Sequence, residues 1–236
     1  MISSRKINAI YNKNMKGITK NPFIMTSPVA VIAIAFLFMM QLPYYAENYE
    51  VTLILNTLIS LNVMMSGIQT MSVLIAEERE KNTLNVLVTS TVSGLDFLLA
   101  HVLTTATITM VVNVAIYFIV GVDGLALSDY LIVTGVGTIA AITLGATFGL
   151  LAKNQAAATT MVMPILMVLL IAPMFFADTF FVENILYYAF TEQMGLAVLD
   201  LMGDGLNWMR VIFLGGNIAL FAVIFAVCYR KRGLAA

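Results

Sequence analysis

Side chains that could carry out chemistry are sparse in this sequence. His101 is the single histidine and Cys228 the single cysteine, so no internal disulfide forms. A hydrolytic metal site needs three or more protein ligands, and a general base needs a partner that positions it. The chain has no GxxxxGKS/T, HExxH or CxxC motif. We therefore predict no catalytic residue and no metal or cofactor bound by this chain, and we expect His101 to form interfacial hydrogen bonds.

A cluster of five charged residues interrupts the apolar sequence, and it consists of Glu77, Glu78, Arg79, Glu80 and Lys81. The residues that follow are mostly apolar and include Thr83, Leu84 and Leu87. Acids at the start of such a segment suit the dipole of a helix. We predict a short helix with a polar end and an apolar ridge, a form that docks into a groove on a partner protein. An ordinary solvated loop is the alternative that the residues alone leave open.

Polar side chains recur in the apolar segment before this cluster. Asn62, Ser66 and Gln69 stand at spacings of four and three, which places them on one face of a helix. This face lines a polar pathway, or it joins neighbouring helices by hydrogen bonds, and the residues alone leave both open. Gly145 and Gly149 form a small-xxx-small pair that predicts close packing of two helices.

Sixteen methionines, among them Met161, invite a metal-transport hypothesis. Flexible thioethers also fill gaps between packed helices, and no second histidine or cysteine accompanies them. We therefore interpret them as packing residues. Pro164 and Pro173 lie in the same apolar segment as Met161, where they free backbone carbonyls and permit a kink.

Membrane-spanning helices must position these residues. The 236 residues are 61% hydrophobic and 11% charged, whereas about a quarter of the residues of a soluble domain are charged. Six apolar segments reach the roughly 20 residues that a helix needs to cross the membrane. We expect them to be helical, because the backbone N–H and C=O groups of a segment in lipid must form hydrogen bonds with each other. The predicted spans are Phe23–Leu42, Val51–Ala76, Leu95–Val120, Tyr130–Ala152, Ala156–Phe176 and Trp208–Tyr229.

The basic residues fall on one side of these spans. This side holds Arg5, Lys6, Lys13, Lys16, Lys20, Arg79, Lys81, Lys153, Arg230, Lys231 and Arg232. The other side holds nine acids, with Arg210 as its one basic residue. The positive-inside rule predicts a multi-pass protein of the plasma membrane with both termini in the cytoplasm.

Two segments lie outside the spans. Residues 1–21 place apolar side chains on one helical face, which predicts an amphipathic helix in the cytoplasmic interface, with a disordered basic tail as the alternative. Residues 177–207 are apolar but interrupted by acids, and we expect one or two short helices that dip into the outer leaflet without crossing it. The predicted fold is an all-α polytopic membrane protein, one transmembrane domain over residues 1–236.

The run EEREKNTLNVLVTSTVSGLDFLLAHVL resembles the signature of the permeases of type 2 ABC exporters, which reads roughly E-R-E-x-G-T-L-E-x-L followed by S/T, P and S before an acid-capped span. The matching positions are Glu78, Arg79, Glu80, Thr83, Leu84, Leu87, Thr89 or Ser90, Val92 and Ser93. The departures are Asn82 for glycine, Asn85 for glutamate and Thr91 for proline. The layout of six spans with an interfacial N-terminal helix is similar over nearly the whole chain.

The resemblance implies a partner for the charged cluster. Residues 77–92 would form the coupling helix that sits in a cleft of a separate ATP-binding-cassette ATPase, which binds ATP and magnesium. The contacts would come from Glu77, Glu78, Arg79, Glu80, Thr83, Leu84 and Leu87. Two permease subunits, identical or different, would pair with two ATPases, and no nucleic acid is involved.

The resemblance also implies where cargo passes. The pathway would run between the two permease subunits, with candidates Asn62, Ser66, Gln69, Met161 and Pro164. Residues 177–207 would form an extracellular gate, whose aromatic candidates are Phe180, Phe181, Tyr187, Tyr188 and Phe190. The resulting hypothesis is an exporter of a hydrophobic or amphipathic cargo, such as a drug or an antimicrobial or toxin-like peptide. A membrane scaffold or immunity protein that binds a peptide without transport is the alternative.

Overall fold

The structure is a computed structural model that describes residues 3–45, 51–81, 93–122, 124–175, 179–203 and 205–232. Within these ranges it is helical and contains no strand. The elements are α1 (Ser4–Ile18), α2 (Pro22–Tyr45), α3 (Val51–Asn62), η1 (Val63–Gln69), α4 (Thr70–Glu80), α6 (Gly94–Val120), α7 (Leu127–Leu151), α8 (Gln155–Phe175), α9 (Phe180–Asn184), η2 (Leu186–Tyr188), α10 (Phe190–Met202) and α11 (Trp208–Arg232).

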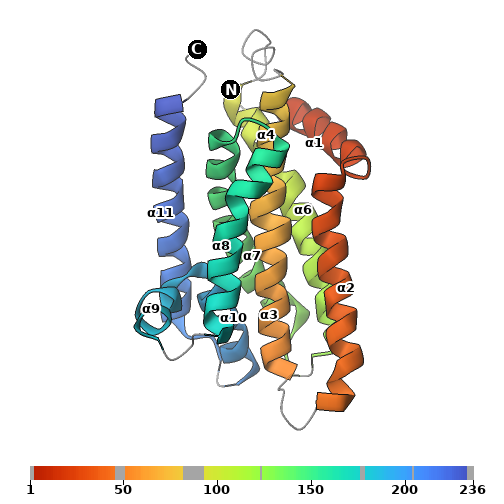
Figure 1. Ribbon diagram of the computed structural model, residues 1–236, viewed down its shortest axis with the longest axis vertical. Coiled ribbons are helices and arrows are strands. Elements are labelled where there is room, and N and C mark those ends of the chain that lie inside the picture. The colour runs from red at the N-terminus through yellow and green to blue at the C-terminus, as the bar shows by residue number, and fades with distance from the viewer. Residues whose placement is uncertain are drawn as a thin grey trace.

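Six segments in the described part of the chain are long and apolar enough to cross a membrane, which confirms the predicted all-α polytopic fold. They are α2, the continuous run α3–η1–α4, α6, α7, α8 and α11. These helices stand side by side in one bundle (Figure 1). Their bounds agree with the sequence-based spans to within a few residues, except that the second span extends further.

Local sequence accounts for several helix ends. Ser93 Oγ accepts a hydrogen bond from Asp96 N at 3.1 Å, and the Asp96 carboxylate accepts one from Ser93 N at 3.4 Å, so a capping box starts α6. Gly121 ends α6 with a φ of 66°, in the left-handed region that favours glycine. Pro22 occupies the first position of α2, where a missing N–H costs nothing.

The second span and α7 form the centre of the bundle. In the most apolar window of the second span 61% of residues are buried, against 6% in α11. A Cβ on Gly145 would lie 2.9 Å from Ile68 Cα, and one on Gly149 would lie 2.9 Å from the carbonyl oxygen of Ser72. The small-xxx-small pair therefore brings α7 against the backbone of the second span, as the sequence predicts.

The middle of the second span is a π-helix, η1, which the spacing of apolar residues does not reveal. Its wider turn shifts the register of the residues that follow relative to an α-helix. Such segments occur often at functional sites. The prediction that Asn62, Ser66 and Gln69 share one face assumed a regular α-helix. This assumption does not hold from Val63 to Gln69.

The two ends of the bundle differ in charge. At one end, called here the basic end, lie α1, the last turn of α4, the start of α6, the α7–α8 turn and the end of α11 (Figure 1). At the other, the acidic end, lie α9, η2, α10 and the start of α11. The α9 and α10 helices have 5 and 13 residues, too short to cross a membrane, as predicted.

The helix of the second span runs without a break to Glu80. This differs from the sequence-based prediction, in which the span ends at Ala76 and a separate helix begins at Glu77. Glu77, Glu78, Arg79 and Glu80 instead form the last turn of α4. Thr83, Leu84 and Leu87 lie outside the described residues.

Candidate functional site

The charged turn of α4 is tied to several helices at the basic end. Glu77 forms an ion pair with Lys81 one turn later, and this hydrogen bond raises the pKa of the Lys81 ammonium. Asn21, directly before α2, donates to Glu77 Oε2 at 2.9 Å and to Gln155 Oε1 at 2.7 Å. The loop before α2, α4 and the start of α8 are thereby linked through one amide group.

Glu78 links α4 to the N-terminal helix. Its carboxylate is nearly buried and accepts a hydrogen bond from Lys13 Nζ of α1 at 2.7 Å. The Lys13 side chain remains 61% exposed. This pair fixes the surface helix α1 to the end of a spanning helix.

Arg79 and Glu80 bind the turn between α7 and α8. Arg79 Nη1 donates to the carbonyl oxygens of Leu150 at 2.7 Å and Ala152 at 3.2 Å. Glu80 Oε2 accepts a hydrogen bond from the backbone N–H of Gln155 at 3.2 Å. A cation thus meets the C-terminus of α7 and an anion the N-terminus of α8, which suits both helix dipoles.

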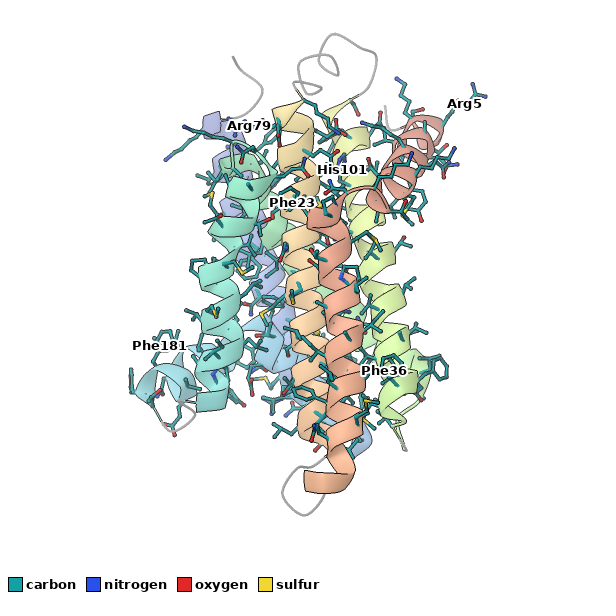
Figure 2. The ribbon with its side chains drawn as sticks, turned by 45° about the vertical axis from the view of Figure 1, so that its right-hand side comes forward. Arg5, Phe23, Phe36, Arg79, His101 and Phe181 are labelled. Carbon is teal, nitrogen blue, oxygen red and sulfur yellow. The ribbon has the colours of Figure 1, made fainter. Side chains whose placement is uncertain are left out.

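The helix α1 also docks on α6. Ser3 N donates to Asp96 Oδ1 at 2.8 Å, and Asn14 Nδ2 donates to Thr104 Oγ1 at 3.3 Å. Ile18 and Asn14 are buried, while Lys16 and Lys20 point outward. This arrangement is the predicted amphipathic helix, and in Figure 2 Arg5 projects from it away from the bundle.

His101 lies inside the bundle near this junction, not at an exposed interface. Its side chain is fully buried, its Nδ1 lies 2.9 Å from the carbonyl oxygen of Phe97, and its ring packs against the Phe97 ring at 4.2 Å. Its Nε2 has no hydrogen-bond partner among the described residues. The hydrogen bond therefore stays within α6, and the prediction that His101 forms interfacial hydrogen bonds is wrong.

The five pathway candidates differ in burial. Asn62 is buried and donates to Asn113 Oδ1 at 2.7 Å and to the carbonyl oxygen of Thr109 at 3.0 Å, both on α6. Ser66 and Gln69 are buried in η1. Met161 and Pro164 lie on the exposed side of α8. Asn62 thus joins helices in this structure, one of the two roles that its sequence position allows.

The aromatic candidates at the acidic end also divide. Phe180, Phe181 and Tyr188 are exposed, and Figure 2 shows Phe181 at the edge of the molecule. Phe190 is 1% exposed and packs against Phe221 at 5.9 Å between ring centroids. Phe190 is therefore part of the hydrophobic core, whereas the first three form a surface.

Arg210 organises the acidic end, a role that the sequence analysis missed. Its Nε lies 3.3 Å from Asp200 Oδ2, its Nη1 donates to Tyr187 Oη at 2.5 Å, and its guanidinium lies 5.5 Å from the centre of the Tyr187 ring. These contacts join α11 to η2 and α10. The signal in the sequence was a lone cation among nine acids.

Glu192 of α10 lies in the same region. Burial raises the pKa of its carboxyl, and the positive charge of Arg210 acts in the opposite direction. Gln193, the next residue, donates to the carbonyl oxygen of Tyr187. The acidic end therefore holds a polar cluster of its own, separate from the charged turn of α4.

The family described as ABC-2 family transporter protein matches residues 2–229. The chain belongs to this family. The match covers nearly all of the chain, so it includes both ends of the bundle and confirms the resemblance found at the charged cluster. No curated protein matches the chain.

Membership makes this permease a multi-pass membrane protein and a membrane subunit of an ABC transporter. Such subunits carry cargo and are generally not catalytic themselves.

Proposed function

We propose that this permease is the membrane subunit of an exporter driven by ATP hydrolysis in a separate ATP-binding-cassette subunit. ATP and magnesium bind to that partner, and the permease pairs with a second permease subunit, identical or related. The basic end faces the cytoplasm, as the positive-inside rule requires. The cargo is hydrophobic or amphipathic, a drug or an antimicrobial or toxin-like peptide, because no chain of charged side chains runs through the described spans.

The observation that carries this proposal is the set of contacts around the charged turn of α4. Glu78 reaches α1, whereas Arg79 and Glu80 reach the α7–α8 turn. Residues 82–92 follow directly in the sequence. A displacement of that segment by an ATPase would therefore move α4 together with α1 and the turn, which is the rigid linkage that a shear or hinge motion needs.

The partner contacts remain those of the charged cluster. Arg79, Glu80 and Lys81 are exposed although they are bound within the chain, so they are accessible to a partner. Glu77 and Glu78 are less exposed, and we assign them mainly to the linkage. Thr83, Leu84 and Leu87 complete the proposed ATPase surface.

The cargo pathway is proposed on the exposed face of α8, between two permease subunits. Met161 and Pro164 lie on this face, and only 11% of the most apolar window of α8 is buried. Ser66 and Gln69 stay candidates because their side-chain oxygens, Oγ and Oε1, have no hydrogen-bond partner among the described residues. Buried polar atoms of this kind are costly, and hydration in an open pathway would relieve the cost.

Residues 177–207 are proposed as the extracellular gate. Phe180, Phe181 and Tyr188 would contact cargo, because they are exposed. Tyr187 and Phe190 would hold the gate in place through Arg210 and Phe221.

The test is purification of the permease from its host in mild detergent, with identification of any stoichiometric partner and an assay of ATP hydrolysis. We expect an ATPase to co-purify, and we expect E80A or L84D to abolish export while the protein still inserts. K16A serves as the control, because Lys16 is exposed on α1. Normal export by both variants would contradict the proposal.

The alternative is a membrane scaffold or immunity protein without transport. Glu77, Glu78 and Arg79 already form hydrogen bonds within the chain, so these charges are stabilised without a second protein. This observation favours the alternative. It predicts a permease that purifies without an ATPase, and protection of the host that persists in E80A and L84D.

A further inference from the structure

An apolar groove lies at the acidic end between α11 and the segment before α10. Its volume is about 380 Å³, within the range of small-molecule sites. One wall consists of Ile185, Tyr188 and Ala189. The other consists of Phe213, Gly216, Asn217 and Leu220, which follow one stripe of α11 at spacings of three, one and three.

A hydrogen bond and an aromatic contact join the two walls of the groove. Asn217 Nδ2 donates to the carbonyl oxygens of Tyr188 and Phe213, each at 2.8 Å, and the rings of Tyr188 and Phe213 meet edge to face at 4.9 Å. Gly216 adds no side chain to its wall, and the space beside it is open, since a Cβ there would meet no atom within 4 Å. The groove is therefore preformed, and an apolar chain can enter it without first separating the two walls.

An exposed acid precedes one wall of the groove in the sequence. Glu183 is exposed on α9, two residues before Ile185, and the exposed rings of Phe180 and Phe181 lie on the same short helix. Arg210 is the single basic residue at this end, and it is already paired with Asp200. An anionic group near α9 would therefore meet like charge, whereas an ammonium group there would meet a carboxylate and aromatic faces.

We propose that this groove binds the apolar part of a cationic amphiphile, with its positive group at Glu183 and the aromatic rings of α9. Only one part of this inference rests on the proposed function, namely that the bound molecule is cargo. It narrows the cargo from amphipathic compounds in general to those with a positive charge. Binding itself needs neither the ATPase nor transport.

The permease contains its own reporter for this site. Trp208 is its single tryptophan, is 73% exposed and begins α11. It precedes Gly216 by eight residues, which corresponds to about 12 Å along a helix. A brominated alkyl chain in the groove would therefore quench the fluorescence of Trp208.

The experiment uses the full chain in nanodiscs of phosphatidylcholine and three brominated dodecyl probes. The head groups are trimethylammonium, maltoside and sulfate, and the concentration of each probe in the bilayer is measured. We expect the cationic probe to quench at a bilayer concentration about threefold lower than the neutral probe, the effect of one exposed ion pair. The anionic probe should require a higher concentration than either.

Matched variants separate the groove from the surrounding surface. G216L should weaken quenching by the cationic probe at least about tenfold, because a leucine side chain takes the space of the ligand. G215L should not, since Gly215 is equally exposed on α11 but does not line the groove. E183Q should remove the advantage of the cationic probe, whereas D129N, which neutralises an exposed acid on α7, should leave it.

Equal quenching by all three probes, or equal effects of G216L and G215L, would overturn the proposal. The groove would then be lipid-facing surface that accepts any alkyl chain. Such a result would leave the exporter proposal intact, because no ATPase takes part. Conversely, loss of ATPase co-purification would leave a positive binding result standing.

Discussion

Lys13 of α1 and Glu78 of α4 form an ion pair with an Nζ–Oε1 distance of 2.7 Å, although 65 residues separate them in the sequence. The carboxylate is nearly buried, whereas the ammonium is largely exposed. Through this pair the surface helix is bound directly to the end of the second span, next to the segment proposed to meet the ATPase. A short charged turn thereby has a structural role inside the chain as well as a proposed role toward a partner.

Charge reversal tests this pair. E78K and K13E should each lower the free energy of unfolding by about 1 kcal/mol, because like charges replace a partly exposed pair. The double variant K13E/E78K should recover most of the loss in thermal unfolding and in export. K16E is the control, since Lys16 is exposed on the same helix. Independent effects of the two reversals in the double variant would show that the pair is not coupled.

The bond between Asn62 and Asn113 tests whether this part of the second span joins helices. N62A and N113A should each lower thermal stability, and the double variant should lose less than the sum. The expected coupling is about 0.6 kcal/mol, the typical value for hydrogen bonds between spanning helices. If N62A instead abolishes export at unchanged stability and without coupling to N113A, Asn62 lines the pathway.

Close packing at Gly149 predicts intolerance to a side chain. G149A places a Cβ 2.9 Å from the Ser72 carbonyl oxygen, so the helices must move apart at a cost of about 1–3 kcal/mol. G135A is the matched control on α7, because its nearest neighbour would be the Met110 Cε at 3.8 Å. Thermal unfolding in detergent measures both, and equal melting temperatures would contradict the predicted overlap.

Glu192 predicts a pH dependence of stability. Burial raises the pKa of its carboxyl above the ordinary value of 4.5, so the folded protein holds this proton more tightly than the unfolded chain. The contribution of Glu192 to stability is therefore full below pH 4.5 and decreases as the pH rises toward the raised pKa. E192Q should match the native protein at low pH and exceed its melting temperature at neutral pH.

The control for this prediction is E183Q, because Glu183 is exposed on α9. Melting temperatures of the three proteins from about pH 4 to about pH 8 make the comparison. If the difference between E192Q and the native protein does not grow with pH, desolvation of Glu192 contributes little. If the difference has the opposite sign, the attraction of Arg210 outweighs burial.

Features that depend on neighbouring residues along the chain follow from the amino-acid sequence alone. The six spans follow from the length and hydropathy of each segment, the start of α6 follows from Ser93 and Asp96, and the buried face of α1 follows from helical spacing. The family followed as well, because its signature is a local run of residues. Each of these depends on contacts within a few residues or with the solvent.

The contacts between groups that are distant in the sequence depend on how the helices pack. Glu78 pairs with Lys13, Arg79 binds the end of α7, and Arg210 binds Tyr187 and Asp200. None of these contacts can be predicted from the spacing of residues in one helix. The burial of Asn62 and the exposure of Met161 were likewise undetermined, since every face of a spanning helix is apolar enough for lipid or for protein. In a membrane hydropathy fixes which segments cross, and packing and hydrogen bonds between helices decide which faces meet.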